Sequence, residues 1–206
     1  MAQEDCETLA KTLKAMGFLL LYNLVESTMK NAIEAIFDEL SASGVNFDAC
    51  RAEMRKVVIR NLKKYSPHDI HTQLSPIAIR LLTRTFHKEK LFNGNVDAQM
   101  IRETVDDYGI ARKWRVKGEK LFLVKHNRNQ LAHGNKSFAE VGRDYSAPEL
   151  LKTKNEVIAF LEEVLESVGQ YISKKQFLDC SLAVSAVSTG LGTSFSLDEP
   201  LNRRTP

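Results

Sequence analysis

The sequence predicts an all-α protein, a helical bundle, and three observations lead to this fold class. Apolar residues recur at helical spacing along most of the chain. No stretch alternates apolar and polar residues as a half-buried strand would. Glycine, proline and serine punctuate the helical stretches, and neither an internal repeat nor a glycine-rich phosphate loop is present. Helices that each carry one apolar face are expected to bury those faces against one another.

The first helical segment is expected to run from the N-terminus to about Leu40, as one long helix or as a broken pair. Its apolar residues recur three or four positions apart, at Leu9, Leu13, Met16, Leu20 and Leu24 and then at Ile33, Phe37 and Leu40. Gly44 interrupts this pattern, so the segment is expected to end near it.

A second helix is expected over residues 48–64, with valine and leucine on one side. Its other side is basic and contains Arg51, Arg55, Lys56, Arg60, Lys63 and Lys64. Such a cluster either holds an RNA backbone through the attraction between cations and phosphates, or is simply a solvated helix face. A further helix is expected to begin at Pro76 and to continue over residues 77–87.

Three more helices are expected in the second half of the chain. The first covers residues 97–108, and the second covers residues 119–133 before Gly134, a residue type favoured in left-handed helix caps. The third starts at the capping-box pattern of residues 146–149 and runs to about Leu178. Its apolar stripe either joins the core or forms a dimer seam, and contains Val157, Leu161, Val164 and Val168.

The composition is that of an ordinary globular protein, with one helical domain expected over residues 1–183. Residues 184–206 are rich in Ser, Thr and Gly and are expected to form a flexible or partner-binding tail. The net charge of +3 permits an anionic partner without requiring one. Three cysteines without a CxxC pair, an acidic N-terminus and the lack of a long apolar run favour a cytoplasmic protein without a membrane partner.

Side chains suited to phosphate chemistry concentrate between Lys125 and Gly134. Lys125, Asn129 and His133 are spaced four residues apart on one helix face, and Arg128 can reach the same space from the neighbouring side. A guanidinium neutralises charge on phosphoryl oxygens, and an imidazole transfers protons near neutral pH. Because a ribose 2′-hydroxyl can attack the adjacent phosphate without a metal ion, this segment is a candidate RNA-cleaving site. Lys125 and His126 are candidate RNA-binding residues.

Spacing alone does not establish this interpretation. Arg80 and His87 also lie within seven positions of each other, and an Arg–His pair at short spacing arises easily by chance. His133 could instead be a hydrogen-bonded, inert helix cap. For His126 a solvent-facing position is favoured over the role of a second catalytic base.

Two other clusters carry weaker functional signals. His68 and His71 flank Asp69, but they lack the further ligand that a metal site needs, so no metal and no cofactor are expected. Trp114 stands among basic residues and either stacks on a nucleic-acid base or is a partly buried anchor.

Residues 128–134, Arg-Asn-Gln-Leu-Ala-His-Gly, resemble the motif of the HEPN superfamily, an Arg and a polar residue followed at short spacing by His. Three other stretches are similar to one branch of that superfamily: Leu20–Ser27, Leu91–Val96 and Ser137–Asp144. The branch consists of bacterial proteins assigned to toxin and phage-defence systems. The resemblance covers about residues 10–175.

The resemblance implies a metal-independent endoribonuclease, a toxin or antiviral defence effector, that dimerises through the motif-bearing helices around a composite cleft. Arg128 and His133 would be catalytic and Asn129 the polar third member. RNA would be the substrate, with an antitoxin or defence-system protein as a further partner. The alternative is a non-catalytic helical module that binds nucleic acid, a nucleotide or a protein. Asn135 stands where a related toxin group has a Tyr that its antitoxin modifies, so the resemblance does not extend to that regulation.

Overall fold

The structure, a computed structural model, describes residues 2–62, 86–88, 91–92 and 94–179. Its described part is a helical bundle without a strand ladder, so the all-α prediction is confirmed; one isolated antiparallel bridge joins Cys50 to Leu178. The tail expected over residues 184–206 and nearly all of the helix expected over 77–87 lie outside the described residues.

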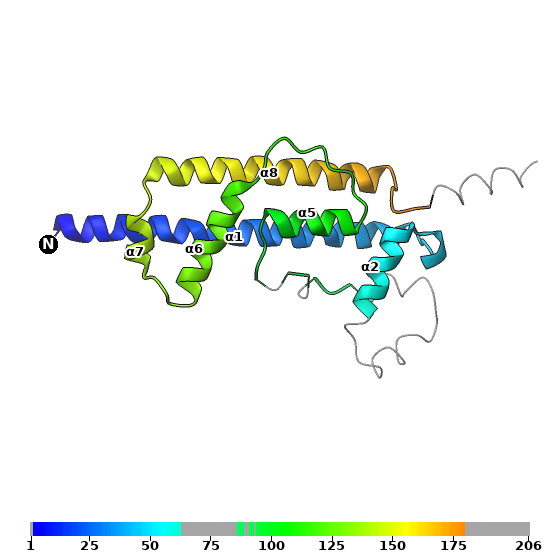
Figure 1. The fold of residues 1–206 in the computed structure, drawn as a ribbon, viewed down its shortest axis with the longest axis horizontal. Helices are drawn as coiled ribbons and strands as arrows, with labels where there is room; N and C mark the ends of the chain where they lie inside the picture. The colour runs from blue at the N-terminus through cyan, green and yellow to red at the C-terminus, as the bar shows by residue number, and fades with distance from the viewer. Residues whose placement is uncertain (1, 63–85, 89–90, 93, 180–206) are drawn as a thin grey trace, which may run out of the picture.

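Two long helices lie side by side and run in the same direction (Figure 1). Shorter helices pack around them, some running steeply across their direction and α5 (Ala98–Asp107) running along it. The N-terminal part of α1 (Ala2–Ala42) lies against α7 (Phe138–Arg143), and α1 also contacts α6 (Glu119–Ala132) and α8 (Ala147–Ser173). None of the described helices is long and apolar enough to cross a membrane. In chain order the described helices are α1 (Ala2–Ala42), the 3-10 turn η1 (Phe47–Ala49), α2 (Ala52–Leu62), α5 (Ala98–Asp107), α6 (Glu119–Ala132), α7 (Phe138–Arg143) and α8 (Ala147–Ser173).

Helix α1 is a single unbroken helix rather than a pair, and it spans the whole bundle. One of its faces supplies much of the hydrophobic core, including Ala15, Phe18, Tyr22 and Met29. Gly17 lies inside α1, where a Cβ atom would approach the flexible Leu150 side chain of α8 to 2.8 Å. The side chains of α1 that lie nearest to solvent include several of the leucines that predicted the helix.

Helix α7 was not predicted as a helix, because six residues are too few to show a periodic pattern. A complete capping box between Ser137 and Glu140 starts it. Gly142 then allows α7 to touch α1, since a Cβ atom there would lie 1.8 Å from the carbonyl oxygen of Lys11. This contact holds the segment that follows the candidate motif against the first helix.

Helix α8 begins as predicted, at a capping box between Ser146 and Glu149. It ends at Ser173, earlier than the expected end near Leu178, because Lys175 has a positive φ of 47° and turns the chain. Phe177 then folds back into the core, and its carbonyl oxygen accepts a hydrogen bond of 2.8 Å from the Arg51 N–H. The apolar stripe of α8 is buried in the bundle of its own chain: Val157, Leu161, Val164 and Val168.

The described basic side of α2 is largely neutralised by carboxylates of its own chain. Arg51 is paired with Glu53 at 2.8 Å, and Arg60 forms an ion pair with Asp107. The Arg51 guanidinium also donates to the carbonyl oxygen of Gly109. These contacts tie α2 to the rest of the bundle and favour a structural role for the cluster over RNA binding. Lys63 and Lys64 lie outside the described residues.

Candidate active site

Helix α6 carries the candidate motif, and glycines delimit both of its ends. Gly118 precedes it with a φ of 69°, and a Cβ atom there would lie 2.8 Å from the Phe160 ring. At the other end Gly134 has a φ of 67°, and the Asn135 N–H donates to the carbonyl oxygen of Gln130 at 2.9 Å. The left-handed cap predicted at Gly134 is therefore confirmed, and it leaves His133 at the last turn of α6.

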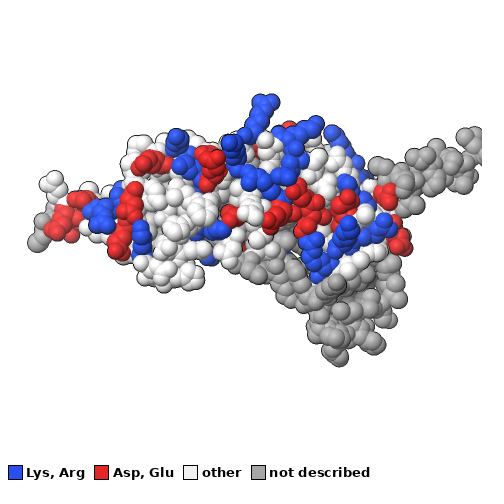
Figure 2. Space-filling model, viewed as in Figure 1, with Lys and Arg blue, Asp and Glu red and all other residues white. Residues whose placement is uncertain are grey.

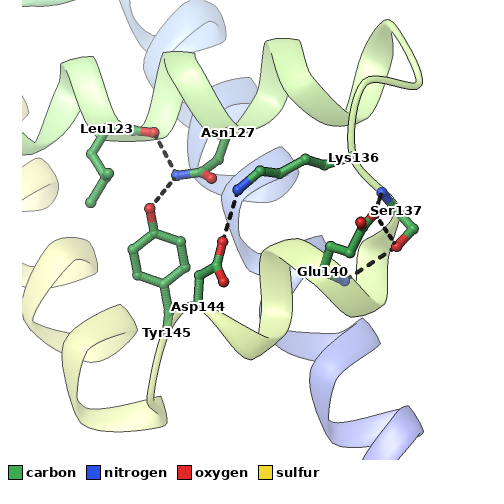
Figure 3. A network of polar contacts seen from close by, with 7 residues as sticks. All are labelled: Leu123, Asn127, Lys136, Ser137, Glu140, Asp144 and Tyr145. Carbon is green, nitrogen blue, oxygen red and sulfur yellow. Dashed lines mark hydrogen bonds and ion pairs between the residues drawn. The ribbon is translucent and has the colours of Figure 1, made fainter.

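Asn127 fixes the position of α6 against the segment that joins α7 to α8 (Figure 3). Its side chain is buried, and the amide nitrogen donates to the carbonyl oxygen of Leu123 and to the hydroxyl of Tyr145, both at 3.0 Å. The Tyr145 carbonyl oxygen accepts from Lys14 of α1 at 2.6 Å. Because the Asn127 amide is buried, its hydrogen bonds restrain the helix that carries the motif.

Arg128 extends from α6 across the face of Tyr22 in α1, with Cζ 4.5 Å from the ring centroid. Its Nη1 donates to the carbonyl oxygen of Gly94 at 3.3 Å and to Oδ1 of Asn129 at 2.9 Å. The Tyr22 hydroxyl accepts a hydrogen bond of 3.2 Å from the Val96 N–H. A ring contact and two acceptors thus hold a half-buried guanidinium in one place.

Asn129 and His133 follow Arg128 along the same helix. Asn129 uses its side-chain oxygen to orient the guanidinium, and its backbone carbonyl accepts from the His133 N–H at 3.0 Å. The imidazole of His133 is exposed and makes no hydrogen bond within the part of the chain that the structure describes. An inert cap would be expected to use its imidazole in a hydrogen bond, whereas this imidazole is available to an incoming group.

Lys125 does not point its charge into the same space, because its ammonium forms an ion pair with Asp97. Asp97 caps α5 and also accepts from the Met100 N–H at 3.0 Å. Burial opposes the charge of Asp97, but these hydrogen bonds outweigh it and hold the pKa of the carboxyl below its usual range. His126 stacks on the exposed Phe122 ring with 6.3 Å between centroids. Among the described residues, neither the ammonium of Lys125 nor the imidazole of His126 bonds to the group formed by Arg128, Tyr22, Gly94 and Asn129.

The structure therefore brings Arg128 and Asn129 into direct contact and keeps His133 one turn further along α6. Sequence reasoning assigned no role to Tyr22, Gly94 or Asn127, which position this cluster. The sequence nevertheless contained a clue to Tyr22 and Gly94. Both residues belong to the stretches that resemble the HEPN branch, Leu20–Ser27 and Leu91–Val96. These stretches are distant in sequence and meet around α6.

The loop between α5 and α6 carries a second basic surface, where Lys and Arg side chains gather (Figure 2). A shallow cavity of about 510 Å³ is lined by Arg102, Arg115 and Lys117, among others. Among the described residues, the side chains of Lys113, Arg115 and Lys117 form no ion pair. These three cations are available to an anionic ligand.

Trp114, in the same loop, is a partly buried anchor. Its indole N–H donates to the hydroxyl of Ser167 at 2.8 Å, and its ring meets the Phe160 ring edge-on with centroids 5.3 Å apart. The indole is therefore held against α8, and the base-stacking alternative receives no support from its position.

In the described ranges, no group of three or more His, Cys, Asp and Glu residues could hold a metal ion. The weak metal signal at His68, Asp69 and His71 lies outside these ranges. Burial raises the pKa of the Cys50 thiol to about 11, so this cysteine is protonated and unreactive near neutral pH.

A family model described as HEPN_MAE_28990-like HEPN matches residues 2–177 of the chain. The match takes in every described helix from α1 to α8 and stops before the region expected to be a tail. No curated protein and no solved structure matches the chain. The match covers most of the chain and agrees with the all-α bundle, and the chain belongs to the HEPN_MAE_28990-like HEPN family.

Proposed function

We propose that this HEPN protein is a metal-independent endoribonuclease whose cleavage centre contains Arg128, Asn129 and His133. Many HEPN domains are ribonucleases, which makes RNA cleavage the first activity to consider for the family. The observation that carries the proposal is the guanidinium of Arg128, held by Tyr22 and Asn129, on the helix that ends at an exposed imidazole. A fixed cation and an available proton-transfer group are the two elements that the reaction needs.

The chemistry follows from these groups. The ribose 2′-oxygen attacks the adjacent phosphorus, a new O2′–P bond forms, and the P–O5′ bond breaks. The proton of the 2′-hydroxyl passes to a base, and the departing 5′-oxygen receives a proton from an acid; His133 performs one of these transfers. The products are a 2′,3′-cyclic phosphate and a free 5′-hydroxyl.

Arg128 stabilises the charge that develops on the phosphoryl oxygens. A guanidinium has five N–H donors, and the hydrogen bonds to Gly94 and Asn129 both use Nη1. The donors on Nη2 and Nε are thus left for a phosphate. Because the ring of Tyr22 and these two acceptors hold the side chain before substrate arrives, less reorganisation is needed during the reaction.

A second copy of the chain would complete the centre. One chain supplies one His133, whereas the reaction has two proton transfers. A homodimer in which the motif-bearing helices face each other would bring a second imidazole to the same phosphate, as the HEPN resemblance implies. We propose this composite cleft as the active form of the enzyme.

The three unpaired cations of the loop between α5 and α6, Lys113, Arg115 and Lys117, would guide the RNA. Helix α6 joins this loop to the motif, and its 14 residues span about 21 Å. A single RNA strand of a few nucleotides can bridge such a distance. Clustered cations contribute the salt-dependent part of the affinity without reading sequence.

Cleavage of labelled total RNA in the presence of EDTA tests the proposed function. Wild type is expected to cut, leaving 2′,3′-cyclic phosphate ends, whereas His133→Ala and Arg128→Ala lose at least a hundredfold in rate. Arg143→Ala serves as the matched control, because Arg143 is an exposed arginine on the neighbouring α7. Loss of wild-type cleavage in EDTA, or an unchanged rate for His133→Ala, would contradict the proposal.

The cellular role that we propose is that of a toxin or antiviral defence effector restrained by an antitoxin or defence-system protein. Induced expression of wild type is then expected to arrest growth and to fragment cellular RNA. His133→Ala, expressed at the same level, is expected to do neither.

The second candidate function is binding without cleavage, and the unpaired cations of the loop are the observation that favours it. A purely binding module would retain RNA affinity in His133→Ala and would cut RNA in neither form. Gel-shift and cleavage assays on the same two proteins separate these functions.

A further inference from the structure

The outward face of the N-terminal half of α1 is apolar and exposed. Five large side chains lie along it, with exposed fractions of 58 % for Leu9, 57 % for Leu13, 43 % for Met16, 67 % for Leu20 and 41 % for Leu24. They are spaced four, three, four and four residues apart, so they form a continuous stripe. We call this stripe, from Leu9 to Leu24, the α1 outer face.

Around this stripe the outward side of α1 itself carries no charged residue. Between Cys6 and Ser27 the outward half of the helix carries no Lys, Arg, Asp or Glu, by the geometry of 3.6 residues per turn. The charged residues of this region point elsewhere: Lys11 pairs with Glu7, and Lys14 reaches the Tyr145 carbonyl oxygen.

Further along the same helix the outward positions become polar, at Ser27, Asn31 and Asp38. A helix face that stays in water normally carries charged side chains. An apolar stripe confined to the N-terminal half of α1 therefore has the character of a buried surface.

We propose that a second copy of this chain packs on the α1 outer face, with the two α1 helices antiparallel. The stripe is nearly symmetric about the point between Met16 and Gly17, because Leu13 and Leu20 are equidistant from that point and Leu9 and Leu24 are too. A twofold axis through this point brings each Leu13 against Leu20 of the second copy and each Leu9 against its Leu24. Met16 then lies opposite Gly17 of the second copy, beside the twofold axis.

The charge of the α1 outer face and the area that it would bury both agree with antiparallel packing of two identical faces. An uncharged face meets its own copy without repulsion, whereas a parallel pair would bring together two helix starts that carry Glu4 and Asp5. In the antiparallel pair each acidic start lies near the polar positions that follow Ser27. The five large side chains of both copies together remove on the order of 1,000 Å² from water, about the lower limit for a specific interface.

This contact is independent of the proposed ribonuclease. Tyr22, over which Arg128 lies, is on the opposite side of α1 from Leu20. A second copy on the α1 outer face therefore leaves the candidate active site uncovered. Together with a composite cleft formed by the motif-bearing helices, it would produce an assembly of four chains with two kinds of twofold interface.

Molecular mass in solution, from sedimentation equilibrium of the full chain, tests the interface. The variant Leu13→Lys/Leu20→Lys is expected to have half the mass of wild type, because it places lysines in the centre of the contact. Asn31→Lys/Ala35→Lys is the matched control, since it adds the same charge to exposed positions of α1 beyond the stripe and should retain the wild-type mass. Equal masses for wild type and the Leu13/Leu20 variant would overturn the proposal.

Cross-linking tests the antiparallel arrangement. In a Cys6→Ser/Cys180→Ser background, oxidised Met16→Cys is expected to form a covalent dimer, because position 16 lies beside the twofold axis. Asn31→Cys in the same background lies far from its own copy and should remain uncross-linked, whereas a parallel pair would link both. The proposal would be overturned if wild type were monomeric and bound phosphatidylcholine–phosphatidylglycerol vesicles, and if Leu13→Lys/Leu20→Lys lost this binding. The α1 outer face would then bind a lipid surface.

Discussion

The guanidinium of Arg128 lies over the ring of Tyr22, with Cζ 4.5 Å from the ring centroid, and the hydroxyl of that tyrosine accepts a hydrogen bond from the Val96 N–H. The first helix, the segment before α5 and the motif helix therefore meet at one aromatic ring. A long side chain that could adopt many rotamers is held by contacts from three parts of the chain. The ring is a positioning element for the cation of the candidate active site.

The two functions of Tyr22 are separable by substitution. Tyr22→Phe keeps the ring beneath Arg128 but leaves the Val96 N–H without its acceptor, so the free energy of unfolding in urea should fall by about 1–2 kcal/mol. Tyr22→Leu also removes the ring, and its RNA cleavage rate is expected to lie well below that of Tyr22→Phe at equal folded concentration. Equal rates for the two variants would show that the ring does not position Arg128.

Removal of the Asn127 amide should destabilise the motif helix. Asn127→Leu leaves the hydroxyl of the half-buried Tyr145 without its donor, and the free energy of unfolding is expected to fall by about 1–3 kcal/mol. The double variant Asn127→Leu/Tyr145→Phe removes both partners and should recover part of this loss. Urea denaturation followed by circular dichroism measures both, with Asn135→Ala as an exposed control. If the double variant lost as much free energy of unfolding as the two single variants together, the hydrogen bond between Asn127 and Tyr145 would not contribute to stability.

The ion pair of Asp97 with Lys125 should make stability depend on acid pH. The pKa of the Asp97 carboxyl is lower in the folded protein than in the unfolded chain. The carboxylate therefore contributes fully to the free energy of unfolding at pH values above its pKa in the unfolded chain. This contribution is lost as the pH falls through the pKa of the folded protein. Asp97→Asn keeps a good helix cap but removes the charge, and should cost about 1 kcal/mol at pH 7. The difference from wild type should shrink below pH 4 in urea titrations. A difference that is constant from pH 7 to pH 3 would contradict this assignment.

The salt dependence of RNA binding should report the loop between α5 and α6. Arg115→Ser/Lys117→Ser removes two unpaired cations, so the slope of log affinity against log salt should become shallower by about one to two. Lys152→Ser/Lys154→Ser removes two exposed lysines of α8 and serves as the control. Filter binding of a single-stranded RNA at several salt concentrations measures the slopes. Identical slopes for all three proteins would exclude the loop from the RNA interface.

Features that depend on neighbours along the chain could be predicted from the sequence. Helical periodicity predicted α1, α5, α6 and α8, and the capping box at Ser146 and the glycine cap at Gly134 were located correctly, because a few adjacent residues determine them. The segment from Arg128 to His133 was singled out as a candidate motif by its residue types and its resemblance to the HEPN superfamily, and its catalytic role stays a prediction.

Contacts between distant segments were decided by the tertiary structure alone. The sequence presents Lys125 as an available cation, yet Asp97, 28 residues earlier, neutralises it. Periodicity cannot reveal which side of α1 faces inward, and the leucine stripe that predicted this helix points to solvent while Tyr22 enters the core. The early end of α8 depends in the same way on Phe177 folding back into the core beneath Arg51. Side-chain spacing along one helix is a local property, whereas the partner of each face is set by packing against elements far away in sequence.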